Sequence, residues 1–227
     1  MPTDTADRSR GRWAGVPAAD RRAERRTLLL DAAFDLLGTE GWSGTTVRAV
    51  CQRARLNPRY FYASFADLDA LLVAVYDRVV EELAAEVRAA VDAVGADPRA
   101  ELRAAIDRTV RFVGDDRRRG RVLYVEALGN EALNRRRIET GYSLVEVIER
   151  DRAARRGAPR SGDQIGRLGA AILVGGFTEL LVAWLDGRIK VSRTQLVDDA
   201  TTLFVALGDA AAGIAAGRAA AHRRGRR

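Results

Sequence analysis

Apolar residues recur at helical spacing along most of the chain. Within residues 22–39, for example, Leu29, Ala33 and Leu37 lie four residues apart and therefore on one face of a helix. No segment alternates apolar and polar residues for long enough to predict a strand. The pattern predicts an all-α protein.

N-capping residues, prolines and glycines divide the chain into about nine helices. The N-caps that we expect are Thr45, Asn57, Asp67, Asp97, Asp115 or Asp116, and Asn130, with Ser-x-x-Gln capping boxes at Ser161 and Ser192. The helices expected from these signals cover residues 22–39, 46–53, 58–63, 68–94, 98–113, 115–129, 131–156, 162–186 and 193–217, with a loop at 157–160.

Residues 168–185 form an apolar run of nearly the length that crosses a membrane. The run contains one carboxylate, Glu179, and three glycines, Gly169, Gly175 and Gly176. A helix that is apolar on most sides is typically buried among other helices. We therefore expect it to be buried against the apolar closing helix, rather than to span a membrane.

Charge is unevenly distributed over the 227 residues, whose formal net charge is +7. Between residues 41 and 66 every charged side chain is positive, and arginines are also abundant in residues 8–26 and in the tail after residue 216. This contrast with a nearly neutral body indicates a module that binds a polyanion. Basic termini that only keep the protein soluble are the alternative.

The chain has one cysteine, Cys51, and one histidine, His222. They allow no intramolecular disulfide, and they argue against catalytic triads and metal sites that need a core histidine. Without disulfides or a signal-peptide pattern, the sequence indicates a reducing compartment. We expect Cys51 to be a small core residue, and we expect neither a metal nor a cofactor.

The two short helices at 46–53 and 58–63, preceded by a longer helix, have the arrangement of a helix-turn-helix. In that motif the second short helix enters the major groove of DNA. The apolar positions that could form its three-helix core are Leu29, Ala33, Leu37, Val47, Val50, Cys51, Leu56, Phe61 and Phe65. Hydroxyls, guanidinium groups and helix N-termini at the other positions can bind phosphates. The DNA-binding residues that we expect are Thr45, Thr46, Arg48, Arg55, Asn57, Pro58, Arg59, Tyr60, Tyr62 and Ser64.

Several motifs follow one another at fixed spacing between residues 22 and 72. They are LLDAAFDLL at 29–37, Gly41-Trp42, TTVRAV at 45–50, Phe61-Tyr62-x-x-Phe65 and Leu71-Leu72. With these motifs the segment resembles the DNA-binding domain of the TetR family of bacterial repressors. The resemblance implies an all-helical homodimer with a small-molecule pocket in its C-terminal domain. It also implies phosphate contacts by Thr46 and Tyr62, and contacts to bases or backbone by Arg48, Arg59 and Tyr60.

The resemblance, together with the missing periodicity of the N-terminus and the basic C-terminus, predicts an organisation in four parts. Residues 1–20 would be a disordered basic arm, and residues 21–72 the DNA-binding domain, with its helix-turn-helix at about 46–65. Residues 73–218 would be the C-terminal ligand-binding and dimerisation domain, and residues 219–227 a basic tail. The helices at 162–186 and 193–217 would form the dimer interface. We expect a cytoplasmic bacterial protein that associates with the nucleoid when it is bound to DNA.

The segment departs from the family pattern at four positions. Arg55 occupies a turn position that is usually glycine, so the turn either holds an arginine in the left-handed region or has another shape. Leu68 replaces a lysine that contacts phosphate, and Pro58 and Arg59 replace a lysine and a glycine of the recognition helix. Arginines before and within the first helix could offset the lost lysine.

We therefore predict a transcriptional regulator, specifically a homodimeric repressor that a small-molecule ligand releases from a palindromic operator. Candidate pocket residues, each of which could equally belong to the core or the dimer interface, are Phe112, Tyr124, Tyr142, Phe177, Glu179 and Trp184. We expect Trp42 to pack on the first helix and the arginines at 117–119 to face solvent. Two alternatives remain: a helix-turn-helix regulator without a small-molecule effector, and an all-helical enzyme, for which no residue set offers support.

Overall fold

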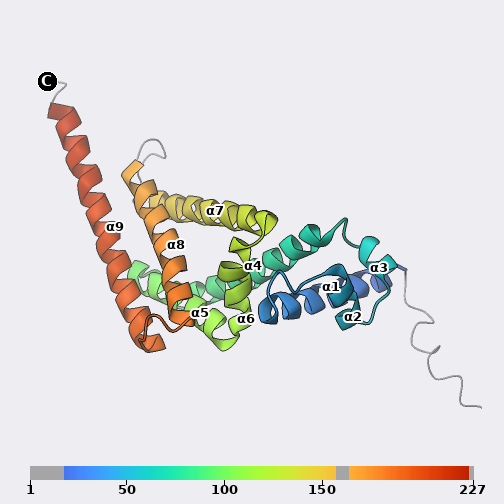
Figure 1. Ribbon diagram of the computed structural model, residues 1–227. Coiled ribbons are helices and arrows are strands. Elements are labelled where there is room, and N and C mark those ends of the chain that lie inside the picture. Colours follow the sequence, from blue (N-terminus) through green and yellow to red (C-terminus); the bar gives the residue numbers. More distant parts are fainter. Residues whose placement is uncertain (1–17, 157–163, 225–227) are drawn as a thin grey trace, which may run out of the picture.

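The computed structural model describes residues 18–156 and 164–224, and within these ranges it contains helices and short connections but no strand. This confirms the predicted all-α class. Three helices, α1 (Ala18–Thr39), α2 (Val47–Ala54) and α3 (Pro58–Tyr62), form a small unit at one end of the molecule. Helix α4 (Leu68–Asp92) runs from this unit into the larger body (Figure 1).

The larger body is built around α4. Its further α-helices are α5 (Pro98–Asp115), α6 (Arg117–Gly120), α7 (Glu131–Arg156), α8 (Gln164–Leu185) and α9 (Arg193–Arg224). Helix α4 packs against α5 and α7, α5 packs against α9, and α8 packs against both α7 and α9. The C-terminal half of α9 extends away from the body, on the side remote from α1–α3 (Figure 1).

Most of the predicted N-caps are confirmed. At six helix starts the side-chain oxygen of the predicted residue accepts a backbone hydrogen bond. These residues are Asn57 (α3), Asp67 (α4), Asp97 (α5), Asp116 (α6), Asn130 (α7) and Ser192 (α9). The loop at 157–160 and the capping box at Ser161 lie outside the described residues, as does the arm up to residue 17. Helix α1 begins at Ala18, so the last three residues of the predicted arm are helical.

One predicted cap is wrong, because Thr46 caps α2 in place of Thr45. The Thr45 side chain is buried, with 1% of its surface exposed, and its hydroxyl donates a hydrogen bond to the Gly41 carbonyl oxygen at 2.8 Å. Both threonines suit a cap chemically. The tertiary packing decides between them, because Thr45 faces the interior and closes the turn that starts at Gly41.

The single helix predicted at 115–129 is divided into three parts. After α6 the chain forms a π-helical turn, η1 (Arg121–Val125), and then a 3-10 turn, η2 (Glu126–Leu128). The wider turn lets Val122 and Leu123 enter the core while Arg121 reaches the end of α1. π-Helical turns of this kind occur frequently at functional positions.

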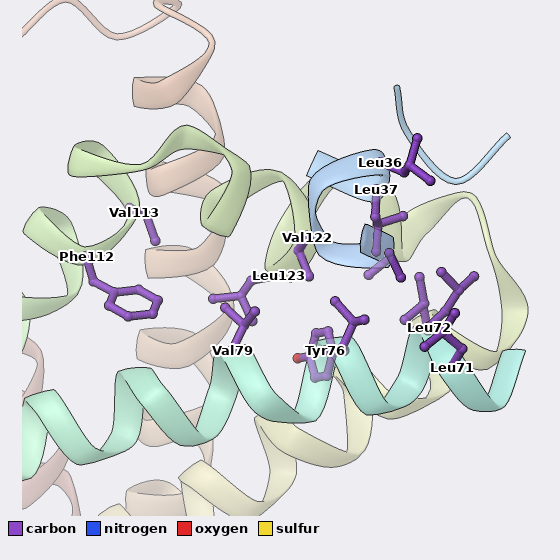
Figure 2. Packing of buried hydrophobic residues seen from close by; sticks show 14 of the residues in the cluster. Leu36, Leu37, Leu71, Leu72, Tyr76, Val79, Phe112, Val113, Val122 and Leu123 are labelled. Atoms are coloured by element: carbon purple, nitrogen blue, oxygen red, sulfur yellow. The ribbon is translucent and has the colours of Figure 1, made fainter. Parts of the chain in front are cut away.

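One continuous apolar core joins the small unit to the body. Leu71, Leu72, Tyr76 and Val79 line one side of α4, and they face buried side chains of α1, α5 and η1 (Figure 2). Each fully buried leucine contributes about 1.5–3 kcal/mol through the hydrophobic effect. The small unit is therefore held to the body by shared packing. Cys51 belongs to the same core, as predicted, and its burial raises the pKa of the thiol.

Helices α8 and α9 are long and apolar enough, by length and composition, to cross a membrane. In the most apolar 18-residue stretch of each helix, only 11% of α8 and 17% of α9 is buried within the chain. The prediction that α8 packs against the closing helix is confirmed. The prediction that α8 is buried holds for only part of it, because Leu168 and Ile172 remain 56% and 60% exposed.

Candidate nucleic-acid interface

A threonine cap sets the start of α2. The Thr46 backbone is extended, and the Thr46 side-chain oxygen accepts a hydrogen bond from the Ala49 N–H at 3.1 Å. The first N–H groups of a helix have no partner within the helix, and together with the helix dipole they favour anions. Since Thr46 is exposed and the first turn of α2 has no acidic residue, α2 begins at a surface suited to phosphate.

The turn between α2 and α3 is closed by an arginine in the left-handed region. Arg55 has φ 54° and ψ 41°, and it is the only non-glycine residue with positive φ in the described ranges. The Arg55 N–H bonds to the Gln52 carbonyl and the Leu56 N–H to the Cys51 carbonyl, which together form a Schellman motif. The first of the two alternatives for Arg55 is therefore correct, and the turn keeps the geometry that glycine usually provides.

Helix α3 is short, and its start follows from two neighbouring residues. Asn57 Oδ1 accepts a hydrogen bond from the Arg59 N–H at 3.0 Å, and Pro58 occupies the first helical turn. Phe61 is fully buried and anchors α3 on the core. Tyr62, on the other side of the helix, keeps 62% of its surface exposed and contacts the Phe61 ring edge-on at 5.2 Å. The helix thus has one buried face and one face open to a ligand.

The exposed face of α2, the turn and α3, called the open face below, carries only positive charge. Arg48, Arg55 and Arg59 are exposed, and no acidic residue lies between residues 41 and 66. Arg53, the fourth arginine of this segment, forms salt bridges with Asp35 and Glu40, so it joins α2 to α1. This arrangement leaves the other three guanidinium groups available for a polyanion.

The structure separates the ten predicted DNA-binding residues into two groups. Those with exposed side chains are Thr46, Arg48, Arg55, Asn57, Pro58, Arg59 and Tyr62. The others are more enclosed: Thr45 is buried, Tyr60 is half-buried, and the Ser64 hydroxyl donates to the Tyr60 carbonyl at 3.0 Å. Thr45 and Ser64 therefore shape the motif from within.

Comparison with known proteins agrees with this geometry. The profile of the bacterial regulatory proteins of the tetR family matches residues 29–75. A TetR-like transcriptional regulator from Rhodococcus sp. RHA1 is 26% identical, with a TM-score of 0.59 over 85% of this chain and 96% of that chain. The chain carries a DNA-binding domain of the tetR family of bacterial regulatory proteins. It is therefore a DNA-binding helix-turn-helix regulator of transcription.

Two further relatives show how far the likeness extends. An HTH-type transcriptional regulator of Haemophilus influenzae is 34% identical over 87 residues, which cover 37% of this chain and 42% of that protein. The alignment thus spans less than half the length of this curated relative. The fatty acid degradation regulator FadR from Bacillus halodurans is 16% identical, with a TM-score of 0.65 over 79% of this chain and 94% of that chain. That likeness shows the fold alone.

A polar joint connects this tetR-family DNA-binding unit to the C-terminal body. Glu126 has only 9% of its surface exposed, and its Oε2 accepts a hydrogen bond from the Trp42 N–H at 2.9 Å. Its Oε1 is paired with Arg121, which in turn donates to the carbonyl oxygens of Gly38 and Thr39 at 3.2 and 2.9 Å. The joint therefore ties η1 and η2 to the end of α1 and the following turn.

Glycine is required where the joint is tightest. Gly41 has φ +79°, and a Cβ there would lie 2.8 Å from Glu126 Oε2. A Cβ on Gly129 would lie 2.6 Å from Nε1 of Trp42. The Trp42 indole thus lies against Gly129 of the body, a contact that the predicted packing on α1 did not include.

In the arginine run at 117–119, Arg117 is exposed as predicted, whereas Arg118 and Arg119 are half-buried, and Arg118 takes part in the contact between units. Arg118 pairs with Asp116 and with Asp35 of α1, and Arg119 lies over the Phe112 ring at 4.2 Å. Hydrogen bonding to Arg118 lowers the pKa of Asp116. The sequence alone does not reveal the contact of Arg118 with α1, because Asp35 lies 83 residues away along the chain.

The six candidate pocket residues are spread over the body. Phe112 is fully buried, while Tyr142 and Glu179 are exposed on α7 and α8. Phe177 contacts Phe204 of α9 edge-on at 5.5 Å, and Trp184 Nε1 donates to the Val191 carbonyl at 3.1 Å. These contacts are those of core or interface residues, one of the two roles left open from the sequence.

Tyr124 is half-buried, and its phenol lies near that of the buried Tyr76. Burial raises the pKa of its phenol, and the nearby phenol of Tyr76 raises it further. Burial also raises the pKa of Tyr76, although a hydrogen bond with Thr140 and the charges of Arg137 and Arg136 oppose this. Both phenols are therefore neutral hydrogen-bonding groups at neutral pH, in the region where α4, η1 and α7 meet.

Proposed function

We propose that this chain is a homodimeric repressor that binds a palindromic operator and leaves it when a small-molecule ligand binds the C-terminal body. The observation that carries the proposal is the open face of α2 and α3, where every charged side chain is positive. A dimer with two such faces would place two recognition helices in successive major grooves. Contacts to phosphate would supply most of the affinity and would make it sensitive to salt.

The exposed apolar side chains of the last two helices support the dimer. Leu168 and Ile172 on α8, and Leu203 and Ile214 on α9, keep between 46% and 65% of their surface exposed. Exposed apolar patches of this kind mark interaction surfaces in soluble proteins. A second copy that covers α8 and α9 would remove these side chains from water.

Ligand-induced release is supported by the continuous core and the polar joint. A ligand in the body can change DNA affinity only if it binds two dimer geometries with different affinity. A release of about 100-fold requires about 2.7 kcal/mol of coupling free energy. The name of the similar FadR structure refers to fatty acid degradation, and the body is nearly neutral, so we propose an apolar effector.

The proposal is tested first by selection from random DNA duplexes. We expect the protein to enrich a palindrome whose half-sites are about one helical turn apart. Fluorescence anisotropy at about 150 mM salt should then show a preference of ~1000-fold or more over a scrambled duplex. If no sequence is enriched, the chain does not bind DNA sequence-specifically. If a single unpaired half-site is enriched, the symmetric dimer is ruled out.

Substitutions on α3 test the placement of the recognition helix. We expect Arg59→Ala and Tyr62→Phe each to weaken binding to the selected operator by about 1–3 kcal/mol if each side chain makes a buried contact. Arg88→Ala is the matched control, because Arg88 is an exposed arginine of α4 outside the motif. If both α3 variants bind as tightly as this control, the recognition helix lies elsewhere.

A further inference from the structure

Three arginines of α1 contact the recognition helix or the residues directly after it, and the family resemblance assigns none of them a role. Arg22 Nη2 donates to the Ala63 carbonyl oxygen at 2.7 Å, and Arg26 lies over the Phe65 ring at 4.3 Å. Between them, the Arg25 guanidinium lies over the Tyr60 ring, 4.6 Å from its centroid. The spacing of three and four residues places all three arginines on one side of α1.

These contacts compensate for the shortness of α3. The helix has five residues, which is too few for a helix to be stable by itself in water. Its last carbonyl groups need donors from outside, and Ala63, which ends it, has right-handed geometry and so forms no glycine-type cap. Arg22 supplies one such donor, and a positive charge at a helix C-terminus is favourable as well.

Tyr60 connects Arg25 to the exposed face of α3. The Arg59 guanidinium also lies 4.6 Å from the centroid of the Tyr60 ring, and Arg59 Nη2 donates to the Tyr60 hydroxyl at 2.6 Å. A guanidinium that stacks on an aromatic ring keeps its edge free for a bidentate contact, such as the one that arginine makes with guanine. Arg25 limits how Tyr60 can move, and Tyr60 limits how Arg59 can move.

We propose that Arg25 is a specificity-determining positioning residue, which fixes the Arg59 guanidinium for base recognition through the Tyr60 ring. This inference rests on the proposed function, because it requires that α3 reads sequence. Binding to DNA would also favour this arrangement of Arg25 and Arg59 electrostatically. Two like charges on one ring repel each other, and an electronegative base edge or a phosphate relieves that repulsion.

A simpler role for Arg25 makes a different prediction. If Arg25 only contacts a phosphate, its loss would weaken binding to every sequence about equally and lower the salt slope by about 1. If Arg25 positions Arg59, its loss would reduce discrimination at the base pairs that Arg59 reads. The two roles are therefore separated by comparing single-base-pair variants of the operator, and not by overall affinity.

The experiment compares the full-length protein with Arg25→Ala, Arg25→Lys, Arg59→Ala and the double variant Arg25→Ala/Arg59→Ala, with Arg88→Ala as the charge control. The probes are the duplex selected by the parent protein and its single-base-pair variants. We expect Arg59→Ala to lose about 10-fold or more discrimination at one or two base pairs. Arg25→Ala should lose discrimination at the same base pairs, and the double variant should lose no more than Arg59→Ala. Arg25→Lys should behave like Arg25→Ala, because it keeps the charge but not the planar stacking group.

Several results would overturn the inference. They are equal weakening on all sequences by Arg25→Ala, losses at different base pairs, additive losses in the double variant, or no loss of discrimination by Arg59→Ala. Should Arg25→Ala fail to fold, Arg25→Lys carries the same test, because it keeps the charge and removes the planar group that lies over the Tyr60 ring. Failure of the parent protein to select any sequence would refute the proposed function before any variant is compared.

Discussion

Single residues of the helix-turn-helix serve either the fold or the DNA surface, and neighbours in the sequence divide these roles. Thr45 is buried and closes a turn, whereas Thr46 is exposed and caps α2. Arg53 pairs with Asp35 of α1 and with Glu40 just after it, whereas Arg55 is exposed in a left-handed turn. Residue type alone therefore does not assign a role. The role of each residue follows from whether its side chain points into the motif or toward solvent.

Arg55 provides a test at this scale. The left-handed region costs a non-glycine residue about 1–2 kcal/mol, and a β-branched residue fits it least well. We expect Arg55→Val to lower the free energy of unfolding by about 1 kcal/mol or more, while Arg55→Gly and Arg55→Asn leave it unchanged or slightly higher. For glycine the relief of strain is offset by about 0.4–1 kcal/mol of chain entropy in the unfolded state. Urea denaturation at one fixed protein concentration measures the series, and equal stability of the valine and glycine variants would contradict the left-handed turn.

At the scale of elements, caps and prolines predicted the helices well because these signals are local. The starts of α3, α4 and α5 follow from Asn57, Asp67 and Asp97, each of which bonds to an N–H two or three residues further on. The division of residues 117–128 into three kinds of helix could not be predicted in this way. It depends on Arg121 and Glu126 meeting the end of α1, more than 80 residues earlier in the chain.

Helix α2 allows stability and DNA binding to be separated with one residue. Thr46→Ala removes the cap and should lower the free energy of unfolding by about 1 kcal/mol. Thr46→Asp keeps a capping oxygen but places a negative charge at the start of α2. We expect Thr46→Asp to match the parent in urea denaturation and to bind operator DNA at least 10-fold more weakly, since the carboxylate repels phosphate. Tight DNA binding by this variant would mean that the start of α2 does not approach the DNA backbone.

At the scale of the whole molecule, the DNA-binding unit and the body share one core and one polar joint. The sequence predicted both units and their order, but not the joint. Glu126, Arg121 and Gly41 are unremarkable in the sequence, and only the fold brings them together. The pocket residues stay a prediction, because aromatic side chains on apolar helices have the same pattern in a core, an interface and a pocket.

Glu126 tests whether the joint holds the two units. Glu126→Ala leaves the Trp42 N–H without its acceptor and removes the carboxylate partner of Arg121, and we expect a loss of about 1–3 kcal/mol in the free energy of unfolding. Hydrogen exchange should rise in residues 38–45 before it rises in the core of α4. Glu131→Ala, which removes an exposed carboxylate of α7, is the control. Unchanged exchange in residues 38–45 would show that the shared core alone fixes the orientation.

The exposed apolar faces of α8 and α9 have a consequence for the life of the protein in a cell. In the proposed dimer these faces pair in a bimolecular reaction, so the fraction of unpaired chains would rise by mass action as the copy number falls. A newly made chain without a sister displays two helices that resemble membrane anchors in length and composition, and chaperones and proteases act on such surfaces. A low copy number would therefore shorten the lifetime of each molecule. Below a certain concentration, most chains would be unpaired and would be degraded.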